Sequence, residues 1–405
     1  MQTDTNSQID RTISGTTVRI LRNVEEIESV REFWSSTPGI LDTDIDVFLA
    51  RPASIPEGLQ LRVLVLYRGG KPVALMAESI LRERFVFRLG WFPLFKPRVN
   101  VFTIRGGLRG DASSENCQEL VHMILKCLKK GEADLVFLPG VEADSALFHC
   151  LKSEPGFLFR DHFTPIRLRR RRELPGSVEE LYASLSHNAR MIFRRIAKRL
   201  NNEFPGQVRM ERVDRFETST DLYGTLAVVD EIAKKTWQRT MSAGLHMTVS
   251  QLEAFKKQAE RGWLRIYILY LADKPAAFWL GALYRRIFFA EYTGYDSDYA
   301  GHSLGTYMLA RMMEEFCSEG VEAIDFAASD EEYKKRYSNA ELPETDLHLF
   351  APSLTGLTLS AMATIRVLLH EPARAFLKRT NLTQRVKKIW RRVRTKRERI
   401  GEARA

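Results

Sequence analysis

Long apolar runs are missing from this 405-residue sequence, which contains no stretch of the roughly 18 apolar residues that a membrane-spanning helix needs. The first fifteen residues, MQTDTNSQIDRTISG, also lack the basic end and apolar block of a secretory signal. We therefore expect a cytoplasmic protein. Its length suits two or three domains, and 44% apolar residues suffice for sizeable cores.

Cysteine and histidine are too sparse and too scattered to indicate a disulfide framework or a metal site. Cys117, Cys127, Cys150 and Cys317 have no close pairing and no metal-type spacing. The eight histidines form no HExxH motif or comparable cluster. We expect reduced, mostly buried thiols and no metal.

The bulk of the chain has almost no net charge, although the whole sequence carries +10. Residues 372–405 contain 13 Lys or Arg against two Glu, a net charge of +11, so the preceding 371 residues sum to −1. The basicity is therefore confined to the end of the chain, which removes most of the support for a protein that binds nucleic acid over its whole surface.

An internal repeat is the most informative feature that is present. Residues 61–82 and 264–285 each consist of an apolar run, a short turn with Lys-Pro and a second apolar run, which is typical of a β-hairpin. Eight of the 22 aligned positions are identical: Leu61/Leu264, Arg62/Arg265, Leu66/Leu269, Tyr67/Tyr270, Lys71/Lys274, Pro72/Pro275, Ala74/Ala277 and Arg82/Arg285. A Gly-containing loop, a helix and a strand follow each copy. We interpret this as a tandem duplication.

The predicted fold class is therefore α/β (mixed α+β), with two similar domains in tandem. Each domain is expected to run strand, helix, three strands, helix, strand, which gives a mixed sheet with helices on both faces. We predict a disordered N-terminus at 1–16, domains at 17–175 and 176–353, and a basic helical tail at 354–405.

One long helix is predicted at residues 177–201, because apolar residues recur there at helical spacing. The apolar face comprises Leu185, Ala189, Ile192, Phe193, Ile196 and Leu200. The opposite face is basic, with Arg190, Arg194, Arg195, Lys198 and Arg199. Either this basic face is simply solvated, or its arginines hold a phosphate or carboxylate in a cleft.

The most suggestive loop is Tyr295–Thr306, between a predicted strand and an amphipathic helix. Its glycines would let the chain turn back and expose consecutive N–H groups beside a helix start, an arrangement that binds phosphate or pyrophosphate. The alternative is a tight strand-to-helix connection in which the glycines serve only the turn and Ser303 caps the helix.

A family resemblance rests on this loop and its surroundings. Tyr295-Asp296, Tyr299, Ser303-Leu304-Gly305, then Asp325-Phe326 and Tyr333-Lys334 resemble the carboxyl-terminal half of the BioF2-like acetyltransferases. These GNAT-superfamily proteins are often named after CelD/BcsL and are related to the FemAB peptidyltransferases. The helix with Ser184-Leu185-Ser186-His187-Asn188-Ala189-Arg190 and the tryptophan Trp237 resemble further family features.

The resemblance implies two GNAT-like domains and acyl transfer from an acyl-CoA, most simply acetyl-CoA, to an amine or hydroxyl. The acceptor would be a small molecule connected with the bacterial envelope or a polysaccharide. Gly301–Thr306 departs from the common GNAT pyrophosphate loop because it lacks the leading Gln or Arg and the closing small pair. A FemAB-like transferase that uses aminoacyl-tRNA is the alternative, and a catalytically silent binding module is the third.

The same resemblance suggests roles for individual residues. Asp296 and Asp325 are candidates for the general base, and Tyr295, Tyr299 and Tyr307 for the acid, although each could instead be structural. The donor loop would comprise Gly301, His302, Ser303, Leu304, Gly305 and Thr306. Substrate-binding candidates are Ser186, Asn188, Arg190, Arg194, Trp237, Tyr333 and Lys334.

The tail is expected to touch an anionic membrane peripherally. Its apolar residues Leu382, Val386, Ile389, Trp390 and Val393 fall on one face of a helix, and basic residues fill the rest. Packing of this stripe on the protein's own body is the alternative. Binding of tRNA would use the same charges without the stripe, and the oligomeric state stays open.

Overall fold

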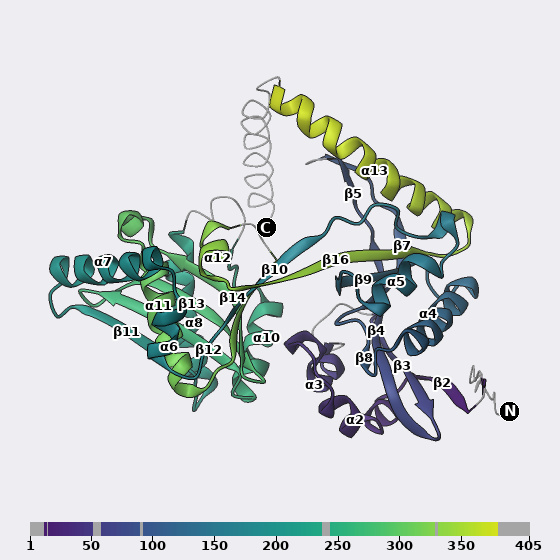
Figure 1. The fold of residues 1–405 in the computed structure, drawn as a ribbon, viewed down its shortest axis with the longest axis horizontal. Helices are drawn as coiled ribbons and strands as arrows, with labels where there is room; N and C mark the ends of the chain where they lie inside the picture. The colour runs from purple at the N-terminus through teal and green to yellow at the C-terminus, as the bar shows by residue number, and fades with distance from the viewer. Residues whose placement is uncertain are drawn as a thin grey trace. The chain divides into compact units, whose positions relative to one another are not determined.

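The computed structural model describes residues 12–13, 15–51, 58–89, 92–236, 244–328 and 331–379 (Figure 1). Trp237, most of the predicted disordered N-terminus and the basic stripe at 382–393 lie outside these residues. Within them, no helix is both long and apolar enough to cross a membrane. The chain forms two compact units, each assembled from separate segments: unit 1 is Met1–Trp34, Gly58–Pro165 and Asp346–Ala405, and unit 2 is Ser35–Glu57 and Ile166–Thr345.

Unit 1 is a sheet in the order β1-β2-β3-β4-β7-β9 followed by the end of β16. Its main helix, α4 (Ser114–Lys129), packs on one face through Leu120, Val121 and Ile124. The main strands are β1 (Thr12–Ile13), β2 (Thr16–Leu21), β3 (Gln60–Arg68), β4 (Lys71–Arg84), β7 (Arg98–Ile104), β9 (Leu135–Glu142) and β16 (Ala340–Phe350). The other elements are α1 (Val24–Glu28), α2 (Arg31–Ser36), β5 (Phe87–Leu89), β6 (Phe92–Phe95), β8 (Arg109–Gly110), α5 (Ala146–Ser153), η3 (Phe157–Phe159) and α13 (Leu354–Arg379).

Unit 2 is a sheet in the order β16-β10-β15-β14-β13-β12-β11, in which the first part of β16 forms one end. Its strands are β10 (Arg167–Glu173), β11 (Val208–Val213), β12 (Leu264–Leu271), β13 (Lys274–Tyr284), β14 (Ile287–Tyr295) and β15 (Ala323–Ala328). Its helices are η1 (Leu41–Thr43), α3 (Ile45–Leu49), α6 (Val178–Ser184), α7 (His187–Glu203), α8 (Ser219–Lys234), α10 (Val249–Glu260), η4 (Ser297–His302), α11 (Leu304–Glu319) and α12 (Glu332–Tyr337).

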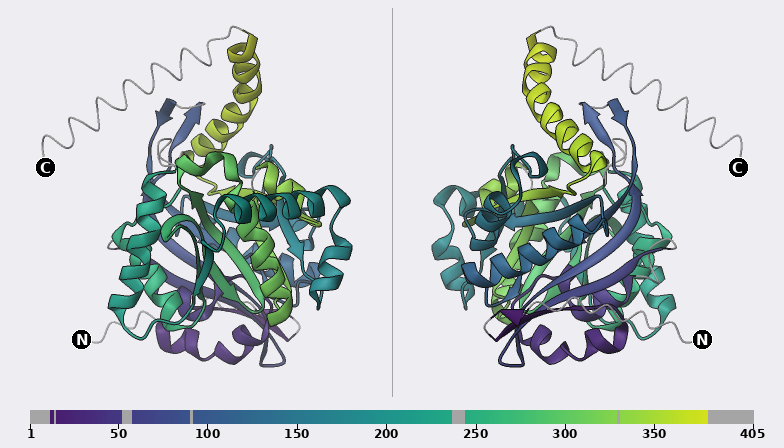
Figure 2. Two further views of the ribbon diagram at one scale, coloured as in Figure 1. Left: turned by 90° about the vertical axis from the view of Figure 1, so that its left-hand side faces the viewer. Right: turned by 90° about the vertical axis from the view of Figure 1, so that its right-hand side faces the viewer.

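The two faces of the unit 2 sheet carry different helices, as the alternation along β12 requires. Tyr267 and Leu269 point to the face covered by α6, α7 and α11. Ile266 and Ile268 point to the opposite face, where α8 and α10 pack (Figure 2). The predicted mixed sheet with helices on both faces is confirmed for this unit.

The duplication is visible in strand pairing as well as in sequence. In the hairpin β3–β4, the register shifts between Leu66 and Tyr67, and in β12–β13 it shifts at the equivalent Leu269 and Tyr270. The next strand pairs in parallel with the strand after the helix in both units: β7 with β9, and β14 with β15. Both predicted hairpins are confirmed, down to the shared irregularity.

The single helix predicted at 177–201 is wrong, because the segment forms two helices, α6 and α7. Each helix begins after its own serine cap: the Ser177 hydroxyl accepts from Glu180 N before α6, and the Ser186 hydroxyl accepts from Ala189 N before α7, at 3.2 Å each. Such N-caps satisfy backbone donors that a continuous helix would bond internally. The apolar face is as expected, with Ala189, Phe193, Ile196 and Leu200 buried.

Candidate functional site

The strands β14 and β15 of unit 2 pair only at their beginnings. Their parallel ladder runs from Ile287 opposite Ala323 to Phe289 opposite Asp325. Beyond that point β14 continues to Tyr295 with β13 as its partner, while β15 pairs with β10 on its far side. Among the described strands, none covers the open edge of β14 after Phe289. Backbone groups along this edge are therefore available to a ligand.

An extra residue in β14 distorts this open edge. Leu280 of β13 faces Tyr292 and Gly281 faces Ala290, so Glu291 has no opposite residue and forms a β-bulge. Only glycine at position 281 lets β13 and β14 approach each other this closely, because a Cβ there would lie 2.2 Å from the Phe289 carbonyl oxygen. The bulge thus depends on a glycine in the neighbouring strand.

Glu291 is the carboxylate whose chemistry is most altered in this unit. Its Oε1 accepts a 2.9 Å hydrogen bond from Gln258 Nε2 of α10. Desolvation by the surrounding protein raises the pKa of Glu291 to about 7, helped by nearby Asp42 and opposed by the Gln258 bond. The residue as a whole is exposed at the surface. A carboxyl group with a pKa near neutrality suits proton transfer at physiological pH.

The start of α11 lies directly after β14 and η4. Ser303 occupies the N-cap position in a left-handed conformation, with φ 57°, and its side chain makes no cap hydrogen bond. In the described chain, the N–H groups of Leu304 and Gly305 have no hydrogen-bond partner. Free N–H groups at the start of a 16-residue helix attract anions.

The glycines of this loop do not make its turn, as the sequence had suggested they would. Neither Gly301 nor Gly305 adopts a positive φ, and the turn is made by Ser303 instead. A Cβ added to Gly301 or Gly305 would meet nothing within 4 Å. The glycines therefore keep the space before α11 open rather than bending the chain. Thr306 follows them, and its N–H bonds Ser303 O at 3.0 Å.

His302 anchors the loop to α7. Its Nε2 lies 2.7 Å from Glu203 Oε2, and its Nδ1 lies 3.3 Å from the Tyr299 carbonyl oxygen. The rings of His302 and Tyr299 also contact Phe204, with centroids 6.0 and 6.3 Å apart. These contacts fix the position of η4, so His302 serves the loop as a support.

Asp296 is buried at the end of β14 and organises the turn that follows. Its carboxylate accepts from Asp298 N at 3.1 Å and lies 3.2 Å from Lys235 Nζ. Its hydrogen bond to Lys235 raises the pKa of that amine. Both carboxylate oxygens of Asp296 thus have partners, which favours a positioning role.

Asp325 is buried at the end of the paired part of β15. It accepts from Arg169 Nε at 2.7 Å and from Ala327 N at 2.8 Å. Lys334 supports the same strand end, because its Nζ donates to the Phe326 carbonyl oxygen at 2.7 Å and pairs with Glu331 at 3.2 Å. These contacts hold β15 where it separates from β14.

Tyr333 contacts both of the strands that flank β14. Its ring lies 6.0 Å from Trp279 of β13 and 6.1 Å from Phe326 of β15, edge-on to both. Burial, and secondarily Glu331, raise the pKa of its hydroxyl well above the usual value. The phenol therefore stays protonated and can donate a hydrogen bond. Tyr295 packs partly buried on the same core, opposite Ala277, and Tyr307 lies under the Arg311 guanidinium.

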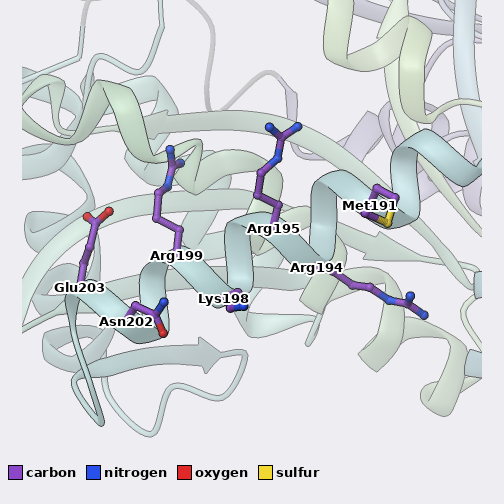
Figure 3. Close-up of a pocket in the computed structure, with 7 residues that line it drawn as sticks. All are labelled: Met191, Arg194, Arg195, Lys198, Arg199, Asn202 and Glu203. Atoms are coloured by element: carbon purple, nitrogen blue, oxygen red, sulfur yellow. The ribbon is translucent and has the colours of Figure 1, made fainter.

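The substrate candidates on α7 fall into two groups. Ser186 caps the helix, and Arg190 Nη1 donates to the Tyr182 carbonyl oxygen at 3.0 Å, so both have local partners. Asn188 and Arg194 are exposed. Arg194 belongs to a groove of about 690 Å³, in which Arg195 and Arg199 point the same way (Figure 3). The described residues that line it are Met191, Arg194, Arg195, Lys198, Arg199, Asn202 and Glu203.

The corresponding place in unit 1 is filled by the protein itself. Glu78 of β4, equivalent to Gly281, forms a buried ion pair with Arg62, whose Nη1 also lies 2.5 Å from Glu132. β7 pairs with β4 without a bulge. The start of α4 does not differ in this way, because the Ser113 side chain makes no cap hydrogen bond either. Among the described strands, the one that precedes the helix start is therefore bulged in unit 2 and regular in unit 1.

Residues 187–335 match the family model described as an acetyltransferase (GNAT) domain. Unit 2 has a GNAT fold. No curated protein matches the chain at a significant level.

Solved structures match over both units at low identity. FemX aligns with a TM-score of 0.57 and 13% identity, covering 80% of this chain and 96% of FemX. A protein of unknown function from Bacteroides thetaiotaomicron aligns at 0.51 and 12%, covering 84% and 99%. The C-terminal domain of a putative lysylphosphatidylglycerol synthetase from Agrobacterium fabrum aligns at 0.50 and 9%, covering 84% and 95%. At such identities these likenesses establish the fold alone.

Glu291 is the residue that sequence reasoning missed. It lies within an apolar strand, IFFAEYTGY, where one charged residue looks like an ordinary solvent-facing position. Gly281 in the opposite strand was the available signal, since a glycine inside a strand often marks a bulge. In the first copy of the repeat, the position of Gly281 is occupied by Glu78, so the two copies differ there.

Proposed function

We propose that unit 2 transfers an acyl group from an acyl-CoA thioester to an amine or hydroxyl. The observation that carries the proposal is the bulged, unpaired edge of β14 directly before the open start of α11. The helix start would hold the donor's pyrophosphate. Backbone N–H groups along the open edge would stabilise the oxyanion that develops on the thioester carbonyl.

We assign roles in this reaction to two side chains, Glu291 and Tyr333. Glu291 takes the proton from the attacking nitrogen or oxygen as the new bond to the carbonyl carbon forms. The Tyr333 hydroxyl donates a hydrogen bond to the sulfur, which leaves as a thiolate as the carbon–sulfur bond breaks. Asp296 and Asp325 act as positioning residues, because their partners are Lys235 and Arg169. The amine or hydroxyl acceptor, related to the envelope or a polysaccharide, is supported only by the family resemblance.

An aminoacyl-tRNA donor is the second candidate, and the basic face of α7 favours it. In the described structure, no acidic side chain forms an ion pair with Arg194, Arg195, Lys198 or Arg199. Elsewhere in unit 2, Arg212 pairs with three carboxylates, on Asp214, Glu315 and Glu319. A row of free guanidinium groups suits a polyanion better than the single phosphate cluster of CoA.

Titration with CoA tests the acyl-CoA proposal. Gly305→Asp should abolish binding, because it places a carboxylate at the helix start where no atom blocks it. Gly305→Ala is the matched control and should bind nearly as well as the parent. An acidic residue in the first turn of a helix is favourable, so Gly305→Asp should fold normally. Undiminished CoA affinity in Gly305→Asp would rule out this donor site.

A variant of α7 distinguishes the acyl-CoA donor from the aminoacyl-tRNA donor. Arg195→Glu/Arg199→Glu should leave CoA binding and acyl transfer intact under the acyl-CoA proposal. Under the tRNA alternative, the wild-type protein should bind tRNA with a steep salt dependence, which the double variant should flatten. Salt-sensitive tRNA binding without any response to CoA would favour the alternative.

A further inference from the structure

The last described helix of unit 1, α13, has two apolar faces. One face is buried: Leu359 and Ala363, with Met362 beside them, pack against a core that includes Phe350, Val99 and Val101. The other face lies on the opposite side of the helix, since its members are rotated about half a turn around the helix axis from Leu359. It consists of Leu354, Leu357, Ala361, Ile365 and Leu368.

This second face is bare. The exposed fractions are 86% for Leu354, 53% for Ile365 and 54% for Leu368. No charged residue interrupts it from 354 to 365. At a rise of 1.5 Å per residue the stripe is about 21 Å long. Soluble proteins rarely expose a continuous apolar strip of this kind unless another surface covers it.

Two further apolar segments lie against α13 within the same unit. The ribbon β5–β6 extends beyond the main sheet next to α13 (Figure 2). Its sequence over 85–95, FVFRLGWFPLF, is almost entirely apolar and aromatic, and its register places Phe87 opposite Phe95 and Leu89 opposite Phe92. In η3, Phe157 and Leu158 are 65% and 54% exposed.

Positive charge surrounds these apolar segments in the sequence. Arg84 and Lys96 flank the ribbon, and Arg88 lies within it. The chain after α13's apolar stripe, residues 372–405, carries a net charge of +11. Exposed aromatic and aliphatic residues bordered by dense positive charge match the two layers of an anionic membrane surface, acyl chains beneath phosphate headgroups.

We propose that the bare face of α13, together with the exposed Phe157 and Leu158 of η3, forms a docking surface for an anionic lipid bilayer. The surface belongs to unit 1 and is independent of the transferase chemistry proposed for unit 2. A second copy of the chain is a poorer occupant, because pairing along the stripe would bring two segments of charge +11 together. The stripe lies flat on the membrane rather than crossing it, since it is far shorter than a span.

Vesicle flotation of the full-length protein tests this proposal. The wild type should float with vesicles containing phosphatidylglycerol and not with pure phosphatidylcholine vesicles. Ile365→Glu/Leu368→Glu should lower the bound fraction at least tenfold although the basic tail is unchanged. Thr355→Glu adds a carboxylate at an exposed position of the same helix away from the stripe, and should float nearly as wild type does.

A second variant guards against misfolding of the first. Phe157→Glu in η3, at a position that is 65% exposed, should weaken flotation independently, and thermal melting should show all variants folded. Wild-type flotation that the double variant leaves unchanged would overturn the role of α13. Failure to float on anionic vesicles at low salt, or a dimer in sedimentation that Ile365→Glu/Leu368→Glu abolishes, would overturn the membrane as occupant.

Discussion

Glu291 illustrates how the position of one residue in a strand determines its chemistry. As the extra residue of a bulge it has no opposite neighbour, and the surrounding protein raises its pKa to about 7. Sequence patterns identify which residues can titrate but not how strongly each is desolvated, because desolvation depends on distant segments. Gln258 and Asp42, which set its environment, are far from it in sequence.

We predict that Glu291→Gln lowers the turnover rate by about 10² to 10⁴, the usual contribution of a general base. In the wild type, kcat/KM should fall as the pH drops through about 7, because the carboxylate becomes protonated. The variant should lose this acidic limb. Rates over pH 5–9 check the prediction, and Asp325→Asn, measured in parallel, should keep the limb. A wild-type limb that survives in Glu291→Gln would assign the base elsewhere.

The same shift predicts a stability effect with a definite sign. The folded pKa is raised from 4.5, so the contribution of Glu291 to stability is full below about pH 4.5 and is lost as the pH rises through about 7. Glu291→Gln should therefore raise the melting temperature at pH 8.5 relative to wild type, and not at pH 4. Glu260→Gln, an exposed neighbour on α10, is the control and should show no such difference.

At the scale of elements, strand pairing was more predictable than helix boundaries. Both hairpins are predicted by apolar runs on either side of a Lys-Pro turn. This signal is local in sequence, so tertiary contacts do not change it. The break between α6 and α7 was missed because apolar spacing continues across it, while the cap made by Ser186 depends on one side-chain hydrogen bond. The open start of α11 was predicted, but with the turn assigned to glycine instead of Ser303.

Gly281→Ala should disturb the bulge. The added methyl would lie 2.2 Å from the Phe289 carbonyl oxygen and 2.8 Å from the Phe288 ring, so β13 and β14 must shift. Such overpacking costs about 1–3 kcal/mol of unfolding free energy, and acyl transfer should fall by more than the loss of folded protein explains. Urea denaturation with activity measured at full folding separates the two effects.

Gly224→Ala serves as the contrasting substitution in the same unit. Gly224 lies inside α8, where a Cβ would meet nothing within 4 Å. Alanine should therefore raise the unfolding free energy by about 1 kcal/mol and leave activity unchanged. If both alanine variants behaved alike, the close approach at Gly281 would not be what maintains the bulge.

At the scale of the whole molecule, the proposed donor site belongs to only one copy of a duplicated fold. The sequence revealed the duplication, but not that Arg62 and Glu78 fill the first copy, since Glu78 aligns with a glycine and its partner lies in another strand. We predict that one CoA binds per chain, as calorimetry would show. Asp111→Asn, at the start of α4, should leave that stoichiometry and affinity unchanged. Two equivalent sites would contradict the assignment.

The shared strand β16 also bears on how the protein is made. Unit 2 has all its segments once Thr345 has been synthesised, whereas unit 1 still needs Leu347, Leu349 and Phe350 for its core. On the ribosome, where domains usually fold in the order of synthesis, the segment made first must therefore wait for the last strand. Nascent unit 1 would expose its unfinished sheet edge for the longest time, so the N-terminal half is where chaperone dependence and premature-termination defects should concentrate.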